Sequence, residues 1–420
     1  MFRTLFANEK GEICDDPMTG MLGRSGNEWV EPSPEEMMPL PGGSTLVLVP
    51  GHFPVGIGGN GETCALQADP YQPDQRAWAV AALLPQGFTR TLIPACVGLP
   101  DAPELPILGY AAVGLKGEQT YVAAIQSDEH RKWHPIHYNT EGLPQRITAF
   151  LKRCADNRIY KQLARCALRY SCFTAQNIFY QRWEGGIPTM PSCNARCLGC
   201  ISERHGMSQA PQNRLDFIPD AREISEVAIN HLSKARDGII SFGQGCEGEP
   251  SLNAHRLADA IRITRQHTEK GTINMNSNAG NTTGVKLLCD AGLQALRVTI
   301  FSGREENYNR YHEPVGYGLS DVLNSICYAR DKGVFVSLNL LVFPGFTDRE
   351  SEMEALLSLI QKGGVNMIQL RNLNIDPGCL MENFPSQEAG MGMAEFLHQL
   401  RLAAPDLRLG SYTHSPNEKK

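Results

Sequence analysis

The first 140 residues carry short apolar runs of strand type that alternate with breaks rich in Gly and Pro. Runs of this kind occupy residues 44–49, 77–83, 111–115 and 120–125. Runs of four to eight apolar residues between turn-forming residues are typical of strands in a β-rich domain. We therefore expect residues 1–140 to form a small β-rich N-terminal domain. No known module identifies its role.

Apolar positions then change to helical spacing. Ile147, Leu151, Ile159 and Leu163 recur at intervals of three to four residues, and many basic residues stand between them. This spacing predicts one or two helices in a connector spanning residues 141–185. The basic side chains between residues 152 and 169 are interpreted as a solvated helix face rather than a nucleic-acid site.

Strand-like runs alternate with helical ones from residue 186 onward, which is typical of a parallel α/β architecture. The strands are expected at residues 186–190, 238–242, 272–276, 296–300, 335–342 and 366–370. Helices are expected at residues 221–234, 252–268, 283–291, 319–332 and 349–361. The prediction is a core domain over residues 186–400, followed by a C-terminal tail, 401–420, whose last ten residues are polar and expected to fray.

Composition narrows the class of protein. At 420 residues the chain exceeds what one core usually organises, so two domains are expected. The net charge of -6 argues against a general nucleic-acid surface. No apolar stretch approaches the ~18 residues of a membrane span, and no leader pattern opens the chain, so the sequence predicts a cytoplasmic protein without a membrane partner. Its 13 cysteines are odd in number and mostly isolated, unlike a disulfide framework.

Three of these cysteines form a tight group. Cys193, Cys197 and Cys200 have the spacing C-x3-C-x2-C. Iron–sulfur cubanes are normally held by four thiolates, so three leave one iron open to another ligand. An open metal position is typical of a catalytic site rather than a structural one. The alternatives are a zinc knuckle completed by His205, or free thiols that pack as small hydrophobic groups.

The spacing, and its place after the first predicted core strand, resemble the radical S-adenosylmethionine (SAM) superfamily. The resemblance implies a partial (β/α)6 barrel, a [4Fe–4S] cluster on the three cysteines, and SAM bound at the open iron. It also implies reductive cleavage of SAM to a 5′-deoxyadenosyl radical that abstracts hydrogen from a substrate, with electrons from a low-potential donor such as flavodoxin or ferredoxin. A radical SAM methylase of RNA and a non-catalytic iron–sulfur electron carrier are the alternatives.

Ligands of such a barrel lie at the C-terminal ends of its strands. A glycine-dense turn follows the second core strand, and its Gly248 and Glu249 resemble the family element that grips the amino group of SAM. Glu247 is the second choice for this role. A flexible turn whose carboxylate caps the following helix is the alternative interpretation.

Other strand ends supply further candidates. The resemblance suggests cofactor contacts from Asn276, Asn278 and Ser302 after the third and fourth strands, although a turn-forming role is the alternative for Asn278. Polar side chains at a barrel mouth are costly without partners, so Gln369 and Arg371 at the sixth strand are candidate substrate or SAM contacts. The apolar end of the fifth strand, followed by Pro-Gly-x-Thr-Asp at residues 344–348, is the expected adenine wall. Gly199 departs from the family pattern, which often has an aromatic residue before the third cysteine.

Two isolated cysteines are candidates for a catalytic role. Cys246 lies in the glycine-dense turn, and Cys379 follows the sixth predicted strand. Either could donate a hydrogen atom or act as a nucleophile at the mouth of the barrel. A passive buried thiol is the alternative for both.

Overall fold

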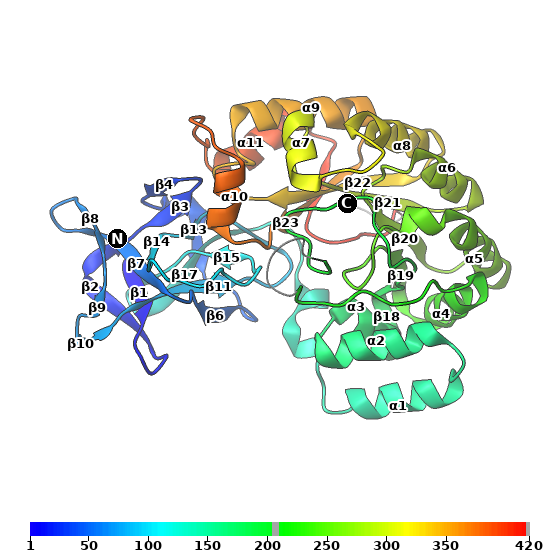
Figure 1. Cartoon of the computed structure of the whole chain (residues 1–420), viewed down its shortest axis with the longest axis horizontal. Coiled ribbons are helices and arrows are strands. Elements are labelled where there is room, and N and C mark those ends of the chain that lie inside the picture. The colour runs from blue at the N-terminus through cyan, green and yellow to red at the C-terminus, as the bar shows by residue number, and fades with distance from the viewer. Residues whose placement is uncertain (204–209, 417–420) are drawn as a thin grey trace. The chain divides into compact units, whose positions relative to one another are not determined.

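The computed structural model describes residues 1–203 and 210–416, so His205 lies outside the described residues. Contacts divide the chain, drawn in Figure 1, into two compact units. The N-terminal unit consists of Met1–His130, Leu341–Ala355 and Leu370–Pro405. The barrel unit consists of Arg131–Leu340, Leu356–Gln369 and Asp406–Lys420.

The Met1–His130 part of the N-terminal unit is built mainly from short strands, as the sequence predicted for this region. Its strands are β1 (Arg3–Ala7), β2 (Ile13–Met21), β3 (Gly23–Ser25), β4 (Glu28–Val30), β5 (Met37–Pro39), β6 (Thr45–Leu48), β7 (His52–Gly58), β8 (Thr63–Ala65), β9 (Ala68–Asp69), β10 (Gln72–Arg76), β11 (Trp78–Leu83), β12 (Phe88–Arg90), β13 (Ile93–Pro94), β14 (Cys96–Gly98), β15 (Tyr110–Ala111), β16 (Val113–Lys116) and β17 (Gln119–Gln126). The largest sheet has the order β12-β17-β16-β1-β2-β7-β14. Alternate residues such as Leu5 and Ala7 of β1 and Val80 and Ala82 of β11 form its core.

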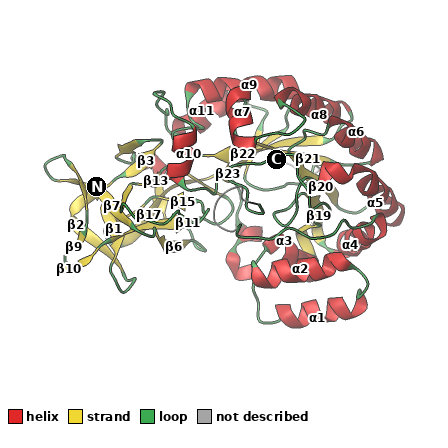
Figure 2. Ribbon diagram, in the orientation of Figure 1, coloured by secondary structure: helices red, strands yellow, loops and turns green. Residues whose placement is uncertain are grey.

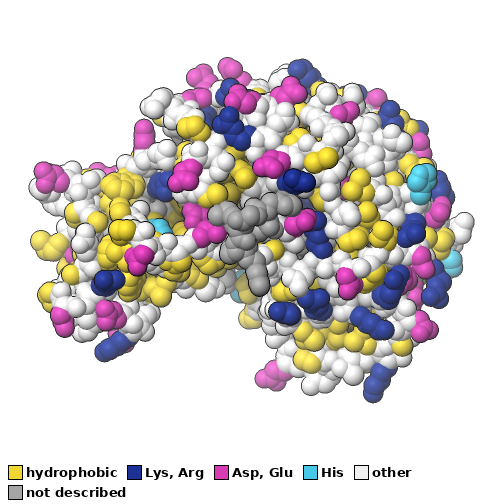
Figure 3. Space-filling view, viewed as in Figure 1, with side chains coloured by type: hydrophobic (Ala, Val, Ile, Leu, Met, Phe, Trp, Pro, Cys, Tyr) yellow, Lys and Arg dark blue, Asp and Glu magenta, His cyan; other side chains and the backbone are white. Residues whose placement is uncertain are grey.

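Three helices follow, where the sequence predicted one or two. They are α1 (Leu143–Arg153), α2 (Arg158–Arg169) and α3 (Phe173–Tyr180). The side chain of Asn157 accepts a hydrogen bond from the Ile159 backbone N–H and so starts α2 as a separate helix. The basic residues of α2 are exposed, and Figure 3 shows Lys and Arg side chains gathered over this helical region.

The barrel sheet contains seven strands in sequence order. They are β18 (Arg182–Gly186), β19 (Arg236–Phe242), β20 (Thr272–Ser277), β21 (Ala295–Ile300), β22 (Phe335–Val342), β23 (Met367–Asn372) and β24 (Arg408–Gly410). The ladders from β18 to β22 and between β23 and β24 are parallel. This curled parallel sheet confirms the predicted α/β partial barrel.

Helices connect these strands along the chain, as Figure 2 shows. They are α4 (Ala221–Lys234), α5 (Ala254–His267), α6 (Thr282–Ala291), α7 (Glu305–His312), α8 (Leu319–Asp331), α9 (Glu350–Gly363), α10 (Pro377–Asn383) and α11 (Met393–Ala403). A short 3-10 turn, η4 (Pro250–Asn253), precedes α5. A capping box begins α4. The Asp220 side chain accepts a hydrogen bond from the Glu223 backbone N–H, and the Glu223 side chain accepts one from the Asp220 backbone N–H.

The two faces of the barrel strands differ in polarity. Because side chains alternate along a strand, Ile273, Leu296, Val298 and Leu338 share one face, and all are buried apolar residues. The opposite face carries the polar residues Ser241, Asn274, Asn276, Arg297, Thr299, Ser337, Asn339 and Gln369. Hydrogen bonds join these side chains across neighbouring strands, so they line one shared interior, which we call the lumen.

The structure corrects two sequence predictions at the ends of the barrel. The first strand is β18, so the prediction of a strand at residues 186–190 was wrong. Pairing with β19 ends at Gly186, and Pro188 has no N–H to extend the ladder. The predicted frayed tail is also wrong over residues 411–414, which are buried beyond β24.

Candidate functional site

The cysteine loop follows the C-terminal end of β18 and is fixed by backbone hydrogen bonds on two sides. The N–H groups of Arg196 and Leu198 donate to the carbonyls of His312 (2.9 Å) and Tyr311 (3.0 Å) at the end of α7. On the other side, the N–H of Gly248 donates to Met190 O (2.6 Å) and that of Glu249 to Ser192 O (2.8 Å). The loop and the glycine-dense turn therefore form one unit.

Gly248 is required for this close approach. A Cβ atom at Gly248 would lie 2.1 Å from the Ser192 carbonyl oxygen, well inside van der Waals contact. Only glycine lets the two backbones meet at this point. The sequence marked Gly248 as a cofactor residue, and the structure shows the packing that its lack of a side chain allows.

The three thiols are partly exposed residues with distinct neighbours. Cys197 Sγ lies 3.2 Å from Nδ1 of His312, and Cys200 Sγ lies 3.7 Å from a guanidinium nitrogen of Arg214. Burial raises the pKa of Cys193 to about 11 and raises the pKa of Cys197 well above its ordinary value. These groups are thiols at neutral pH, and a bound metal would convert them to thiolates.

The two carboxylates of the turn have different surroundings. The oxygens of Glu247 accept five hydrogen bonds, from the backbone N–H groups of Thr189, Met190, Gly243 and Gln244 and from the Thr189 hydroxyl. Burial raises the pKa of Glu247 to about 7, against the opposing effect of these donors. The Glu247 carboxylate therefore joins the segment after β18, at Thr189 and Met190, to the turn after β19, at Gly243 and Gln244.

The Glu249 carboxylate can accept a further hydrogen bond. Its Oε1 accepts from the Ser251 N–H (2.9 Å) and the Ser277 hydroxyl (2.6 Å), and its Oε2 accepts from the Asn278 N–H (2.8 Å). A carboxylate has about four lone-pair sites, so one remains on Oε2. Burial raises the pKa of Glu249. The bond to Ser251 also makes Glu249 the cap of η4, so the capping interpretation and the ligand interpretation hold together.

Asn276 and Asn278 lie at and just after the end of β20, and both are buried. The Asn278 amide donates to the Asn194 side chain at 2.8 Å, which ties β20 to the cysteine loop. The Asn276 amide donates to Gly243 O at 3.3 Å. Buried Ser302 accepts from the Arg304 N–H at 3.0 Å, and Gln369 faces the lumen beside Arg297.

Three of the predicted site residues, Cys246, Arg371 and Cys379, have different surroundings. Cys246 is buried, and its thiol hydrogen-bonds with that of Cys166 in α2. Arg371 belongs to the N-terminal unit, where its guanidinium meets the amide oxygen of Gln86. Cys379 lies in the first turn of α10, also in the N-terminal unit. Their catalytic and cofactor roles stay predictions.

The Pro-Gly-x-Thr-Asp motif after β22 forms a self-capped turn in the N-terminal unit. The Thr347 hydroxyl accepts from the Phe343 N–H, and Asp348 accepts from the Gly345 N–H. Gly345 has φ +81 and packs directly on the backbone of Gly26. The motif is therefore a folding element in its own right, and its part in an adenine wall stays a prediction.

Sequence reasoning missed His312, Arg214 and Arg297. His312 carries no local signal, because it is 115 positions from Cys197, and Arg214, 14 positions from Cys200, belongs to no recognisable motif. Arg297 did carry one, since a charged residue stands inside an otherwise apolar strand.

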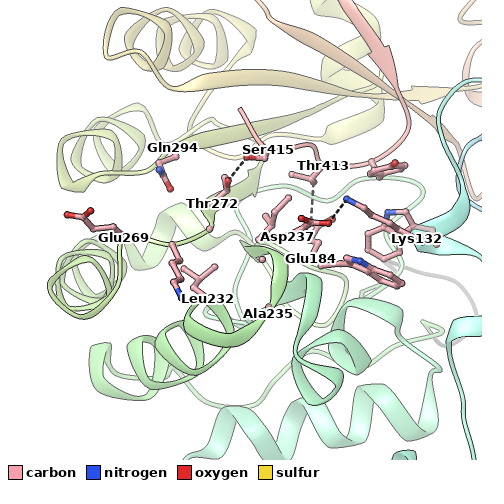
Figure 4. A pocket seen from close by; sticks show the side chains of 17 residues that line it. Lys132, Glu184, Leu232, Ala235, Asp237, Glu269, Thr272, Gln294, Thr413 and Ser415 are labelled. Atoms are coloured by element: carbon pink, nitrogen blue, oxygen red, sulfur yellow. Dashed lines mark hydrogen bonds and ion pairs between the residues drawn. The ribbon is translucent and has the colours of Figure 1, made fainter. Parts of the chain in front are cut away.

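A separate cavity of about 470 Å³ lies at the N-terminal ends of the strands, opposite the end that carries the cysteine loop. Figure 4 shows the ion pair of Lys132 with Asp237 and the hydrogen bonds of Thr272 with Ser415 and of Glu184 with Thr413 at its walls. The buried residues after β24 thus close this end of the barrel. In barrels of this kind the N-terminal face is the one associated with stability.

Within the described residues, no three His, Cys, Asp or Glu side chains are grouped as ligands of a single metal ion. The donor set of the cysteine loop fits a cluster instead, because its three thiols can each bind a different iron. The described part of the chain also contains no helix both long and apolar enough to cross a bilayer.

Residues 187–358 match the family model described as the radical SAM superfamily. The segment contains the cysteine loop and the glycine-dense turn, so this part of the chain is a radical SAM domain. The cofactors of this family are a [4Fe–4S] cluster and SAM, and its reaction begins with cleavage of SAM at the cluster. No curated protein matches the sequence.

Solved structures that are similar to this chain include SuiB of Streptococcus suis bound to its precursor peptide, with 10% identity over 50% of this chain and 42% of that one (TM-score 0.34). The [FeFe]-hydrogenase maturase HydG of Carboxydothermus hydrogenoformans has 15% identity over 66% and 72% (TM-score 0.37). Coproporphyrinogen III oxidase of Escherichia coli, a radical SAM enzyme, has 12% identity over 53% and 52% (TM-score 0.37). The chain spans less than half of the SuiB structure.

Proposed function

We propose that Cys193, Cys197 and Cys200 bind the cluster, that Glu249 holds the amino group of SAM, and that the enzyme abstracts hydrogen from a substrate bound in the lumen. The main support is the hydrogen bonding that joins the cysteine loop to Gly248 and Glu249. This pairing brings the three thiols and the carboxylate together in one rigid unit. When bound, the cluster supplies the electron that cleaves SAM to a 5′-deoxyadenosyl radical.

The free lone pair of Glu249 supports its role over that of Glu247. Glu247 already accepts five hydrogen bonds on two oxygens, whereas Glu249 accepts three. An ammonium donor can therefore reach Glu249 without displacing a protein donor. A bound ammonium would also favour the ionised carboxylate, against the effect of burial.

His312 and Arg214 are positioned to stabilise the cluster thiolates. The Nδ1–H tautomer of His312 would donate to Cys197, and the Arg214 guanidinium to Cys200. Such donors favour the negatively charged form of sulfur and so favour the reduced cluster. The electron must come from a low-potential donor protein of the flavodoxin or ferredoxin type.

The test is anaerobic reconstitution of the full chain with iron and sulfide, followed by dithionite and SAM, with 5′-deoxyadenosine quantified. We expect SAM cleavage by the parent protein. We expect Cys197→Ala to lose the cluster and all cleavage while its circular dichroism spectrum stays native. Cys289→Ala, a buried cysteine of α6, is the matched control and should keep both.

Three outcomes would count against this function. A cluster that forms but leaves SAM intact with several reductants would favour an electron carrier. A colourless protein that binds zinc instead of iron would favour a structural metal site. Global unfolding of Cys197→Ala, but not of Cys289→Ala, would assign the cysteine loop a folding role.

A further inference from the structure

The lumen is polar where barrel interiors are usually filled by branched apolar side chains. Asn274 of β20, Arg297 of β21 and Asn339 of β22 come from three adjacent strands and point to the same face. Asn276 pairs with Arg297, and Thr299 pairs with Asn339, so Arg297 is offset by two positions from Asn274 on one side and from Asn339 on the other. Diagonal neighbours on adjacent strands are roughly 7–8 Å apart, so one small ligand can bridge Arg297 and Asn339.

Each of these three side chains keeps a buried polar atom without a hydrogen-bond partner. The atoms are Oδ1 of Asn274, Nε of Arg297 and Oδ1 of Asn339. A buried polar atom without a partner costs roughly 1–3 kcal/mol, so unpartnered atoms grouped at one place indicate that a ligand completes them. Asn274 is only 1% exposed, so bulk water does not supply its partner.

The charge in the lumen defines one end of this ligand. The Arg297 guanidinium donates to Gln369 Oε1 and to the Thr413 hydroxyl, both at 3.2 Å, and both acceptors are neutral. Among the described residues, no ion pair joins Arg297 to a carboxylate. A half-buried guanidinium that makes no direct ion pair can bind a ligand with an anionic group, and a carboxylate matches its planar fork.

The unpartnered asparagine oxygens indicate the chemistry of the other end of the ligand. The unpartnered oxygens of Asn274 and Asn339 can only accept, so the ligand must present N–H or O–H donors to them. Glu184 lies on the same side of the sheet and shares the Thr413 hydroxyl with Arg297. This nearby negative charge disfavours a doubly charged group such as a phosphate and favours a single carboxylate.

We propose that the lumen binds a small 2-hydroxy or 2-amino acid as substrate, with its carboxylate on Arg297 and its hydroxyl or amine on Asn339. The proposal names the substrate class of the radical SAM reaction proposed above and rests on that function. It assigns Arg297 to substrate recognition and leaves SAM to the residues around Glu249.

The test measures thermal stabilisation of the reconstituted, SAM-loaded protein by matched pairs of small probes. The acids are L-lactate and L-alanine, their amides are L-lactamide and L-alaninamide, and propionate lacks the donor group. We expect at least one acid to raise the melting temperature in a saturable way, because a ligand that binds only the folded state stabilises it. Its amide and propionate should bind at least tenfold more weakly.

Variants then assign the contacts. Arg297→Gln should weaken binding of the acid at least tenfold, and Arg297→Lys should recover part of it. Asn339→Leu should reduce the preference for lactate over propionate. Arg262→Gln, which removes an exposed arginine of α5, is the control for loss of a positive charge and should bind like the parent protein.

Three results would overturn the proposal: stabilisation by neither acid, equal stabilisation by an acid and its amide, or a loss of SAM affinity in Arg297→Gln equal to its loss of acid affinity. Iron content and the SAM-induced change in the electron paramagnetic resonance spectrum are measured on every sample. A parent protein that fails those two measurements contradicts the radical SAM function itself, so the two failures are distinguishable.

Discussion

The mouth of the barrel and its lumen treat buried polar groups differently. At the mouth, Glu247 and Glu249 are held by N–H and hydroxyl donors, and backbone hydrogen bonds fix the cysteine loop. In the lumen, Asn274, Arg297 and Asn339 each keep an unpartnered atom. The comparison teaches that the two carboxylates at the mouth already have protein donors, whereas the three lumen side chains keep atoms that a ligand can complete.

The largest expected effect is the loss of the packing between the cysteine loop and the glycine-dense turn at the mouth of the barrel. In Gly248→Ala the new methyl group would overlap the Ser192 carbonyl, so the cysteine loop must move. We expect loss of most of the bound iron and a decrease of about 3 kcal/mol in the free energy of unfolding, at the upper end of overpacking costs. Iron analysis and urea unfolding measure these. Gly59→Ala, which meets open space, should change neither, and a Gly248→Ala protein with full iron content would contradict the rigid mouth.

Next in size is the removal of charge at the mouth. Glu249→Gln replaces the carboxylate that we assign to the amino group of SAM. Hydrogen bonds to charged groups contribute about 1.5–3 kcal/mol, so SAM affinity should fall roughly 10- to 100-fold. Equilibrium binding of SAM to the reconstituted protein is the measurement. The exposed Glu305→Gln is the control, and unchanged affinity in Glu249→Gln would remove this residue from the SAM site.

A smaller expected effect concerns the pH dependence of the stability of the barrel rather than the candidate site. His231 of α4 donates from Nε2 to Trp183 O at 2.8 Å, and burial lowers the pKa of His231 from 6.5 to about 4. Between these two values the unfolded chain binds a proton that the folded one does not, so stability falls as pH falls.

We expect His231→Gln, which keeps an N–H donor but does not titrate, to remove about 2 kcal/mol of the stability lost between pH 7.5 and 5. Urea unfolding at the two pH values measures this. An equal loss of stability in the parent protein and the variant would show that His231 does not titrate as proposed.

The smallest expected effect is a shift in the reduction potential of the cluster. His312→Phe removes the donor to Cys197 but keeps an aromatic ring beside Tyr308 and Tyr311. Losing this donor disfavours the reduced, more negative cluster, so the reduction potential should become more negative. A hydrogen bond of about 1 kcal/mol corresponds to a shift of roughly 40 mV for one electron. Spectroelectrochemical titration measures it, and a potential that stays the same or rises would contradict a donating His312.

Local sequence determined much of this protein. The strand and helix periodicities placed α4, β19 and β22 within two residues of their observed bounds, because each hides an apolar face that repeats at a fixed interval. The C-x3-C-x2-C spacing identified the family, because one short loop carries all three thiols. Gly248 and Glu249 followed from the same local logic.

Tertiary structure alone decided the rest. The contact of His312 with Cys197 joins residues 115 positions apart, and no local pattern encodes such a contact. The burial of residues 411–414 depends on β24 joining the sheet beside β23, which the short, polar sequence did not reveal. The different hydrogen bonding of Glu247 and Glu249 likewise depends on groups from separate strands, such as Thr189 and Ser277. Chemistry that lies in one loop can be read from the chain, whereas chemistry assembled from several strands depends on how they pair.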